Sequence, residues 1–559
     1  MNDNLFLIAI GGTGMRCLES FVHLCAAGLF DNHEINILTL DTDQTNGNKA
    51  RVESLINLYN NVKTEQGVEP RPRSNTFFSA KLNLYRFFTD YSQSETSSLA
   101  ALSQTTNHSV SEDNQDLSDL LFERDTVQQF KLDHGYRAQT HLGSMLMYHG
   151  IVDAARNKKN GGDNVKDQER ELAAFLDALS TNVSKARVFV FGSIFGGTGA
   201  SSIPVIPRAL SEALRILKDN AVLDPVLFGS TLLTDYFTFA TPQQSQLDLE
   251  KVIASSNKFA LNCQAALSFY YNDKTVKNTY KRLYHIGWPS ELKINFSEGQ
   301  GDKVKTGGAN QKNDCHMVEM MCAAAAYDFF NENREVLEDI KEAKYLFRTV
   351  DTDERGALKL SGASFVGDEK GEMFENKLGA FLSFAHIVLS LYDGAKAGVC
   401  GTTNLIDYFQ KAYEEAYNLY NPLPRVQRED IDKYLKQFAY EFTDLGLSFG
   451  WIYQVHNSIA KGNGTFIFAP EAFKQTEAEL RSIDPGVIFA DPRHHWEAGK
   501  GVFGGESKDR MKRFDKFIAD NVKAEDTLPK DNQGNTLREK FLAHMYNAIT
   551  KAQHFNIKN

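Results

Sequence analysis

Two short glycine-rich segments are the residues of this sequence best suited to chemistry. Both spell Gly-Gly-Thr-Gly: they are Gly11, Gly12, Thr13 and Gly14, and then Gly196, Gly197, Thr198 and Gly199. Glycine lets a backbone turn sharply and approach an anion closely. The N–H groups that open a helix are unsatisfied and carry partial positive charge, so phosphate binds there. The pattern therefore predicts two phosphate-binding turns, to which Thr198 and Ser201 could add hydroxyl donors.

The elements around these segments predict that the two turns meet. Residues 5–10 (LFLIAI) and 35–40 (INILTL) are continuously apolar, which is typical of parallel strands buried on both faces, and residues 15–27 between them have helical spacing. Residues 187–192 (RVFVFG) predict another such strand, and residues 203–217 the helix after it. Ligands bind at the carboxyl ends of strands in open parallel sheets. We therefore expect an α/β fold with a Rossmann-type parallel sheet and both turns at one site.

The residues after the last glycines exclude one class of phosphate-binding protein. A Walker A loop needs a lysine at that position to reach the β and γ phosphates. Met15 and Ala200 stand there instead. The sequence therefore does not predict a P-loop NTPase.

A dinucleotide fold remains as an alternative. Its fingerprint is G-x-G-x-x-G, and Gly12 and Gly14 supply the first two glycines, whereas Cys17 replaces the third. Asp41 or Asp43, after the second strand, could hold a ribose. This NAD-dependent interpretation leaves the second Gly-Gly-Thr-Gly segment without a role.

Three turns taken in order resemble the nucleotide-binding loops of the tubulin/FtsZ superfamily. Those proteins have a glycine loop after the first strand, an Asn-Thr-Asp-like turn after the second, and a GGGTGTG or GGGTGSG signature after the fourth. Residues 10–14, 40–43 (LDTD) and 195–201 (FGGTGAS) resemble these loops, with Phe195 in place of the first signature glycine. Residues 135–143, which end at Gly143, are similar to the intervening loop near the γ-phosphate.

The resemblance covers about residues 1–340 and carries implications for function. It implies a tubulin/FtsZ-like domain that binds GTP or GDP with Mg²⁺ and acts as a switch or self-assembles into a filament or oligomer. The expected setting is a bacterial cytoplasm. A nucleotide-binding scaffold without turnover, within a multi-protein defence or regulatory complex, is the second alternative beside the NAD-dependent enzyme.

The resemblance also suggests residues for the base and ribose. In the family these groups contact the start of a long central helix, which residues 313–319 (NDCHMVE) resemble, so Asn313 could bind the base or ribose. Asn is equally typical of a helix N-cap. Asp235, after the strand at 226–233, is either a ribose acceptor or a solvated loop acid. The residues alone leave both choices open.

Catalysis has weaker support than binding. Family members hydrolyse GTP when a neighbouring subunit inserts acidic residues that follow the central helix. Asp351 and Asp353 are the only acidic cluster there, but their spacing differs from that pattern and is also typical of a solvated turn. Phosphoryl transfer needs an aligned water and neutralised charge, so the sequence predicts binding and leaves GTPase activity open.

Length and composition set the remaining expectations. The 559 residues suggest several units: a nucleotide-binding domain at 1–345 with an insertion at about 60–125, a second α+β domain at 346–500, and a helical region at 501–559. The net charge of −11 disfavours direct nucleic-acid binding. Six cysteines without a CxxC pair predict free thiols in a reducing compartment. We expect no membrane span, because no apolar stretch reaches about 20 residues, and no metal-ligating set of side chains.

Overall fold

Seven parallel strands form the central sheet in a computed structural model, which describes residues 3–88, 120, 140–218, 225–239, 255–295, 309–384 and 536–557 with short gaps. In sheet order the strands are β3 (Lys81–Phe88), β2 (Glu34–Asp41), β1 (Asn4–Ile10), β4 (Ala186–Phe191), β5 (Leu227–Leu233), β7 (Tyr280–Ile286) and β9 (Lys344–Arg348). Each neighbouring pair is parallel. The chain moves outward from β1 to β3, then returns to the other side of β1 at β4. This confirms the α/β class with a Rossmann-type parallel sheet.

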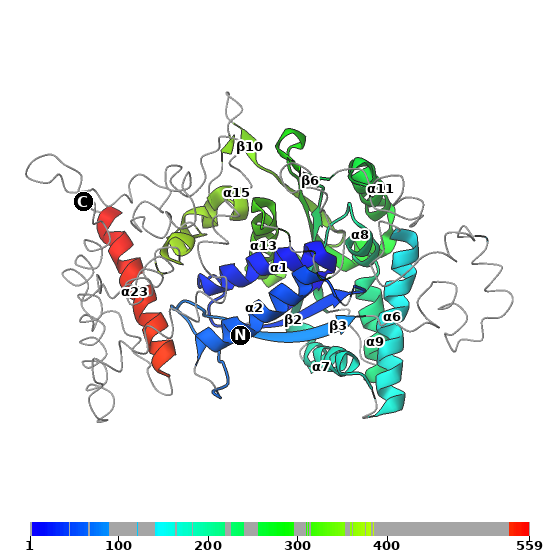
Figure 1. The fold of residues 1–559 in the computed structure, drawn as a ribbon, viewed down its shortest axis with the longest axis horizontal. Helices are drawn as coiled ribbons and strands as arrows, with labels where there is room; N and C mark the ends of the chain where they lie inside the picture. Colours follow the sequence, from blue (N-terminus) through cyan, green and yellow to red (C-terminus); the bar gives the residue numbers. More distant parts are fainter. Residues whose placement is uncertain are drawn as a thin grey trace, which may run out of the picture.

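Helices cover both faces of the sheet, as Figure 1 shows. On one face α1 (Gly11–Ala26) contacts α2 (Gly47–Lys63) and α13 (Met317–Phe330). On the other face α7 (Asp167–Thr181) and α9 (Ile206–Leu217) pack with α6 (Thr140–Gly161). The central strands need apolar residues throughout because both faces are covered, and every residue of β4 and β5 is buried.

The first part of the predicted insertion belongs to the sheet. Residues 81–88 (KLNLYRFF) form β3, which pairs with β2 along its whole length. This strand was missed because it lies at the sheet edge, where polar residues alternate with apolar ones and the continuous apolar signal of a central strand is absent. Residues 89–119 and 121–139 lie outside the described part of the chain, so the remainder of that prediction is untested.

The central helix is shorter than expected. The sequence predicts one helix over residues 316–343, but α13 ends at Phe330 and is followed by α14 (Arg334–Glu338) and then β9. The side chain of Asn333 accepts a hydrogen bond from the backbone N–H of Glu335 and so starts a new helix. All fourteen residues of α13 are buried.

The remaining described elements are small or peripheral. They are α8 (Gly197–Ser202), α11 (Phe259–Asn272), α12 (Lys274–Thr279), α15 (Gly362–Val366), three 3₁₀ turns (Val183–Lys185, Ser256–Lys258 and Ser290–Leu292), the pair β6 (Phe237–Thr238) and β8 (Ile294–Asn295), and the pair β10 (Asp351–Thr352) and β11 (Leu358–Lys359).

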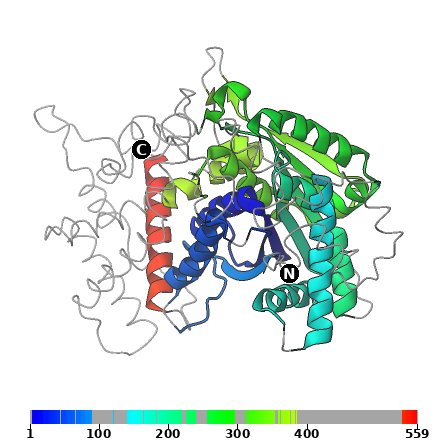
Figure 2. The ribbon, with the colours of Figure 1, turned by 45° about the vertical axis from the view of Figure 1, so that its right-hand side comes forward.

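The last described helix, α23 (Leu537–Ile557), packs beside α2 at the opposite end of the sequence. Figures 1 and 2 both place this red helix against the blue N-terminal part of the chain. It confirms the helix expected at residues 537–553. Residues 385–535 lie outside the described part of the chain, so the second domain and the rest of the C-terminal region stay predictions. No helix in the described ranges is long and apolar enough to cross a bilayer.

Candidate functional site

The two glycine turns lie against each other at the carboxyl ends of β1 and β4, which are neighbours in the sheet. A Cβ atom built on Gly11 would lie 3.1 Å from the Cβ of Thr198. We call residues 11–14 and 196–199 together the glycine junction. Because the strand order reverses between β1 and β4, the junction occupies the position where ligands bind in open α/β sheets.

Both turns are the beginnings of helices and not loops that precede them. We expected helices to start near residues 15 and 203, but α1 begins at Gly11 and α8 at Gly197. No side chain caps the start of either helix. The first N–H groups of a helix lack intrahelical partners and carry partial positive charge. The glycine junction therefore brings uncapped helix starts together, which is the arrangement that attracts an anion.

Three of the glycines are required by the fold itself. A Cβ on Gly14 would lie 2.6 Å from the carbonyl oxygen of Phe191, and one on Gly199 would collide with the backbone of Ser193. Gly11 has φ = +66°, a conformation that other residues adopt at a cost. These positions let α1 and α8 pack closely on the strands, so their glycines say little about a ligand.

Gly12 and Gly196 are different, because a Cβ atom there would meet only side chains and both residues are partly exposed. A Cβ on Gly196 would only touch the hydroxyl of Ser193, at 3.4 Å. A Cβ on Gly12 would lie 3.1 Å from side-chain atoms of Asn46 and Gln311. Glycine therefore leaves room on the accessible side of the junction at Gly196, which suits close approach by a ligand. The space beside Gly12 is filled by amide side chains.

Asp41 ends β2 and is almost wholly buried. Its Oδ1 accepts hydrogen bonds from the backbone N–H groups of Thr42 (2.8 Å) and Asp43 (3.2 Å). Its Oδ2 and the hydroxyl of Thr42 are buried without a hydrogen-bond partner in the described part of the chain. Removal from water raises the pKa of Asp41 to about 7. A buried carboxyl oxygen with spare capacity is chemically suited to a hydroxyl donor or a hard cation.

Asp43 has a role in the turn itself. Its Oδ1 accepts hydrogen bonds from the backbone N–H (3.1 Å) and hydroxyl (3.0 Å) of Thr45. The turn leads into α2, whose first residues are capped by Asn46. Asp41 and Asp43, both predicted as ribose-binding candidates, thus have distinct local surroundings.

Four side-chain amides meet beside Gly12, and we call Asn46, Asn48, Gln311 and Asn313 the amide cluster. Asn46 Nδ2 donates to Gln311 Oε1 at 2.8 Å, and Asn48 Nδ2 donates to Asn313 Oδ1 at 3.1 Å. The backbone N–H of Asn313 donates back to Asn48 Oδ1. The cluster joins the start of α2 to the segment that precedes α13, at the rim of the glycine junction.

The alternative role of Asn313 as an N-cap is wrong. The N-cap of α13 is His316, whose Nδ1 accepts from the N–H of Val318 at 3.1 Å. Glu319 completes a capping box by accepting from the N–H of His316 at 2.9 Å. Asn313 lies three residues earlier, with its side chain in the amide cluster.

Asp235 is not a solvated loop acid. It is buried, forms an ion pair with Lys293, and lies 3.8 Å from the sulfur of Cys263. It follows β5 on the carboxyl side of the sheet. If Asp235 bound a ribose hydroxyl, the carboxylate of Asp235 would have to serve both that hydroxyl and Lys293.

Gly143 and Ser201 lie where α6 meets α8. Gly143 is in the first turn of α6, and the hydroxyl of the next residue, Ser144, donates to the carbonyl of Ser201 at 2.8 Å. The hydroxyl of Ser201 is fully buried and donates to the carbonyl of Thr198 at 3.0 Å. Its proton is therefore used inside α8, and Thr198 is the more accessible hydroxyl of the two.

A buried charged network fixes the helices around the junction, and the sequence did not predict it. Arg16 pairs with Glu319 at 2.6 Å, and the hydroxyl of Tyr236 donates to the same carboxylate at 2.6 Å. Burial is the largest single influence and by itself would lower the pKa of Arg16, but Glu319 together with Tyr236, Cys315 and Cys17 outweighs it, so the pKa is raised. Burial raises the pKa of Glu319. The pair ties the second turn of α1 to the first turn of α13.

The predicted catalytic acids stay untested. Asp351 is in β10 and pairs with Lys359 of β11. It follows β9, which is separated from β4 by β5 and β7. Asp353 lies outside the described residues.

The described residues contain no group of three or more histidine, cysteine, aspartate or glutamate side chains placed to hold a metal ion. Any Mg²⁺ at the junction would therefore take most of its ligands from phosphate oxygens and water, as is usual for this ion. A scan against protein-family models and a search of curated proteins both found no match to this chain.

Proposed function

We propose that this chain binds a guanine nucleotide, with the phosphates at the glycine junction, and that bound nucleotide controls its self-association. The observation that carries this proposal is the contact between Gly11 and Thr198, which brings two uncapped helix starts to one point. One glycine turn is common in α/β sheets, whereas two that meet at the reversal of strand order suit a chain of phosphates.

Each part of a nucleotide has residues that fit it. Gly196 leaves room for phosphate oxygens to approach the backbone. Asp41 and Thr42 have buried oxygens that no other described residue contacts by a hydrogen bond, which suit water molecules of a hydrated Mg²⁺ or a ribose hydroxyl. The amide cluster offers both donors and acceptors, as the edge of guanine requires.

The guanine preference and the assembly rest on the resemblance to the tubulin/FtsZ superfamily. In that family the nucleotide lies between subunits, and the neighbour supplies the catalytic acids. The absence of a clean acidic pattern near Asp351 makes nucleotide-controlled association the proposal, with GTPase activity secondary.

The proposal is tested by measuring affinities for GTP, GDP, ATP and NAD on the purified protein, together with its mass as a function of nucleotide. Preference for GTP or GDP, with association that depends on nucleotide, is the expected result. A constant mass with tight guanine nucleotide would leave the scaffold alternative. If the protein bound none of these four compounds, the proposal would be wrong.

One observation favours an NAD-dependent enzyme as the second candidate. Asp41 is the last residue of β2, where dinucleotide folds place the acid that holds the ribose. NAD binding stronger than GTP binding in the same measurements would select this alternative.

A further inference from the structure

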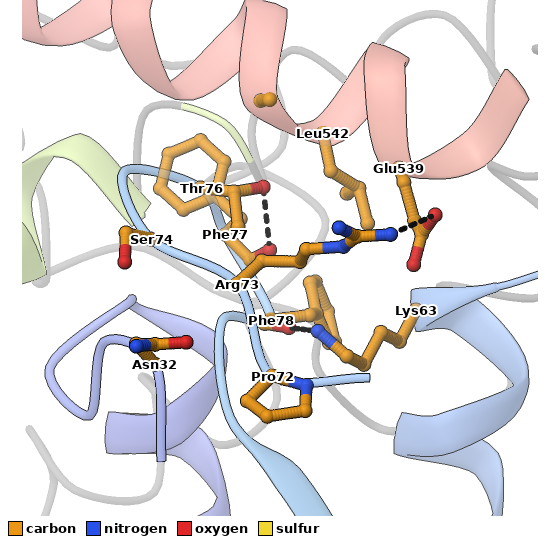
Figure 3. A pocket seen from close by; sticks show the side chains of 11 residues that line it. Asn32, Lys63, Pro72, Arg73, Ser74, Thr76, Phe77, Phe78, Glu539 and Leu542 are labelled. Carbon is orange, nitrogen blue, oxygen red and sulfur yellow. Dashed lines mark hydrogen bonds and ion pairs between the residues drawn. The ribbon is translucent and has the colours of Figure 1, made fainter. Parts of the chain in front are cut away.

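A second site lies at the other end of α2. There a cavity of about 250 Å³ is enclosed by the end of α2, the segment that precedes β3, and α23. The seventeen residues of α2 separate it from the amide cluster, which corresponds to about 25 Å along the helix. Figure 3 shows Lys63, Arg73 and Glu539 around this cavity, each from a different part of the chain.

Lys63 is a buried lysine held by backbone carbonyls. Its side chain is only 1% exposed, and its Nζ donates to the carbonyls of Phe78 (2.6 Å) and Ser79 (3.0 Å). No carboxylate in the described ranges forms an ion pair with it. An ammonium group has three donors, so one remains beyond these two carbonyls. The loss of hydration lowers the pKa of Lys63 to about 7, although the charge of Glu539 opposes this effect.

Arg73 is the second cation, and its own pairing is incomplete. Its guanidinium contacts Glu539 through one nitrogen at 3.4 Å, which is long for a charge-assisted hydrogen bond. Its Nε is buried and has no hydrogen-bond partner in the described part of the chain. The same Glu539 oxygen accepts from the backbone N–H of Thr536 at the start of α23, at 3.0 Å.

The segment that follows Arg73 is held in an unusual conformation. Asn75 and Phe78 both have φ = 55°, which is rare for residues other than glycine and costly for a bulky one. Phe78 in this conformation has its carbonyl oxygen directed at Lys63, whose Nζ donates a hydrogen bond to it. The backbone of this segment therefore holds the side chain of Lys63 in place at the cavity.

We propose that this cavity binds a small oxyanion, inorganic phosphate, between Lys63 and Arg73. The described lining of the cavity holds one carboxylate, Glu539, which pairs with Arg73 and already accepts from a helix start, so the donors exceed the acceptors. Arg and Lys donors are the usual partners of phosphate oxygens. Glu539 competes with the anion for Arg73, and Asp31 lies further away as a weaker opposing charge.

Two neighbouring substitutions should change the affinity in opposite directions. Phosphate binding is measured by isothermal titration calorimetry at constant ionic strength, with chloride as the replaced anion. Arg73→Gln should weaken binding roughly tenfold or more, because it removes a charge-assisted donor. Glu539→Gln should strengthen binding, because it removes the competing charge and retains an acceptor for the backbone of α23.

The controls separate this cavity from the glycine junction and from general charge effects. Arg71→Gln removes an exposed arginine two residues away and should leave the affinity unchanged. Gly196→Ala should affect only phosphate bound at the glycine junction. Lys63→Met removes a buried charge and should abolish phosphate binding in the cavity. The same phosphate affinity in wild type, Arg73→Gln and Glu539→Gln, or a change in the same direction for both, would overturn the proposal.

Discussion

Asp41 is a carboxylic acid at the end of β2 that is almost wholly removed from water. Burial raises its pKa from 3.8 to about 7, so the folded protein keeps a proton that the unfolded chain releases. Between about pH 4 and pH 7 the folded state therefore binds more protons than the unfolded state, and stability falls as the pH rises through this window. Above pH 7 the full cost of the buried charge remains.

Replacing Asp41 with asparagine should stabilise the protein and weaken nucleotide binding. Asn retains an oxygen for the N–H groups of Thr42 and Asp43 but carries no charge. We expect the free energy of unfolding at pH 8 to increase by on the order of 2–4 kcal/mol, since each pKa unit corresponds to about 1.4 kcal/mol. Urea titrations of both proteins at pH 5 and pH 8 measure this difference. A variant whose stability relative to wild type is the same at both pH values would contradict the assignment.

The glycines of the first turn should respond differently to the same substitution. Gly14→Ala places a Cβ 2.6 Å from a backbone oxygen that cannot move independently. It should cost about 1–3 kcal/mol of overpacking, in spite of the better helix propensity of alanine. Gly12→Ala meets only side-chain atoms, and should change stability by less than about 1 kcal/mol. Urea midpoints rank the two variants, and equal midpoints would show that the strands do not constrain Gly14.

At the scale of elements, Arg16 and Glu319 join α1 to α13 next to the junction. Removing one partner leaves a buried charge without compensation, which typically costs about 3–5 kcal/mol. Glu319 also accepts from Tyr236 through one oxygen and from the N-terminus of α13 through the other. A glutamine at this position can keep its oxygen on the N–H of His316, while its NH2 group donates to the hydroxyl of Tyr236. The pair is therefore suited to a double-mutant cycle.

Arg16→Met and Glu319→Gln should each destabilise the protein, whereas the double variant should be more stable than the sum of the two effects predicts. We expect a coupling energy of about 1–3 kcal/mol. Chemical denaturation of the four proteins gives this value. Simple additivity would mean that the ion pair does not connect the two helices energetically.

The sequence predicts the elements that are buried on both faces and misses those at the edges. The apolar runs of β1, β2, β4 and β5 locate these strands within a few residues. β3 and β9 were missed because their sides are partly exposed, so polar residues interrupt the pattern. Glycine in a sequence usually indicates the end of a helix. Gly14 and Gly199 nevertheless lie inside helical turns, where nearby backbone atoms leave no room for a side chain.

The site was predicted only where its residues are local in sequence. The glycine junction follows from two motifs and the rule for parallel sheets. The amide cluster joins residues 265 positions apart, and only Asn313 was a candidate. The Asn46-Gly47-Asn48 segment is typical of a helix start and could have indicated Asn46. Nothing in the sequence indicates which distant side chain an amide or Arg16 will meet.

For the whole molecule, α23 ties the described end of the chain to its beginning. Phe77 is fully buried and forms ring contacts with Phe384 and with Tyr546 of α23, at centroid distances of 4.6 and 5.2 Å. These contacts lie beside the cavity that Lys63 and Arg73 enclose. The segment that precedes β3 therefore connects the parallel sheet to residues more than 300 positions later.

Phe77→Ala should destabilise the packing of α23 more than it destabilises the sheet. Loss of this side chain should cost about 3–5 kcal/mol in total stability, and hydrogen exchange should increase in α23 more than in β1. Val68→Ala, at an exposed position on the same segment, should stay within about 0.5 kcal/mol of wild type. Equal loss of protection in α23 and β1 would mean that α23 unfolds only with the whole domain.

The most direct test of the account is the affinity of GTP and GDP for wild type, Gly196→Ala and Gly161→Ala. Gly196 has extended backbone angles that alanine also adopts, and its methyl group meets only the hydroxyl of Ser193. Gly161 lies at the far end of α6 and serves as the control. The account predicts that Gly196→Ala folds normally and binds guanine nucleotide at least about tenfold more weakly, through loss of close backbone contact with phosphate, while Gly161→Ala binds as wild type does. Unchanged affinity in Gly196→Ala, or no nucleotide binding by wild type, would contradict it and leave the glycine junction as a packing device of the sheet.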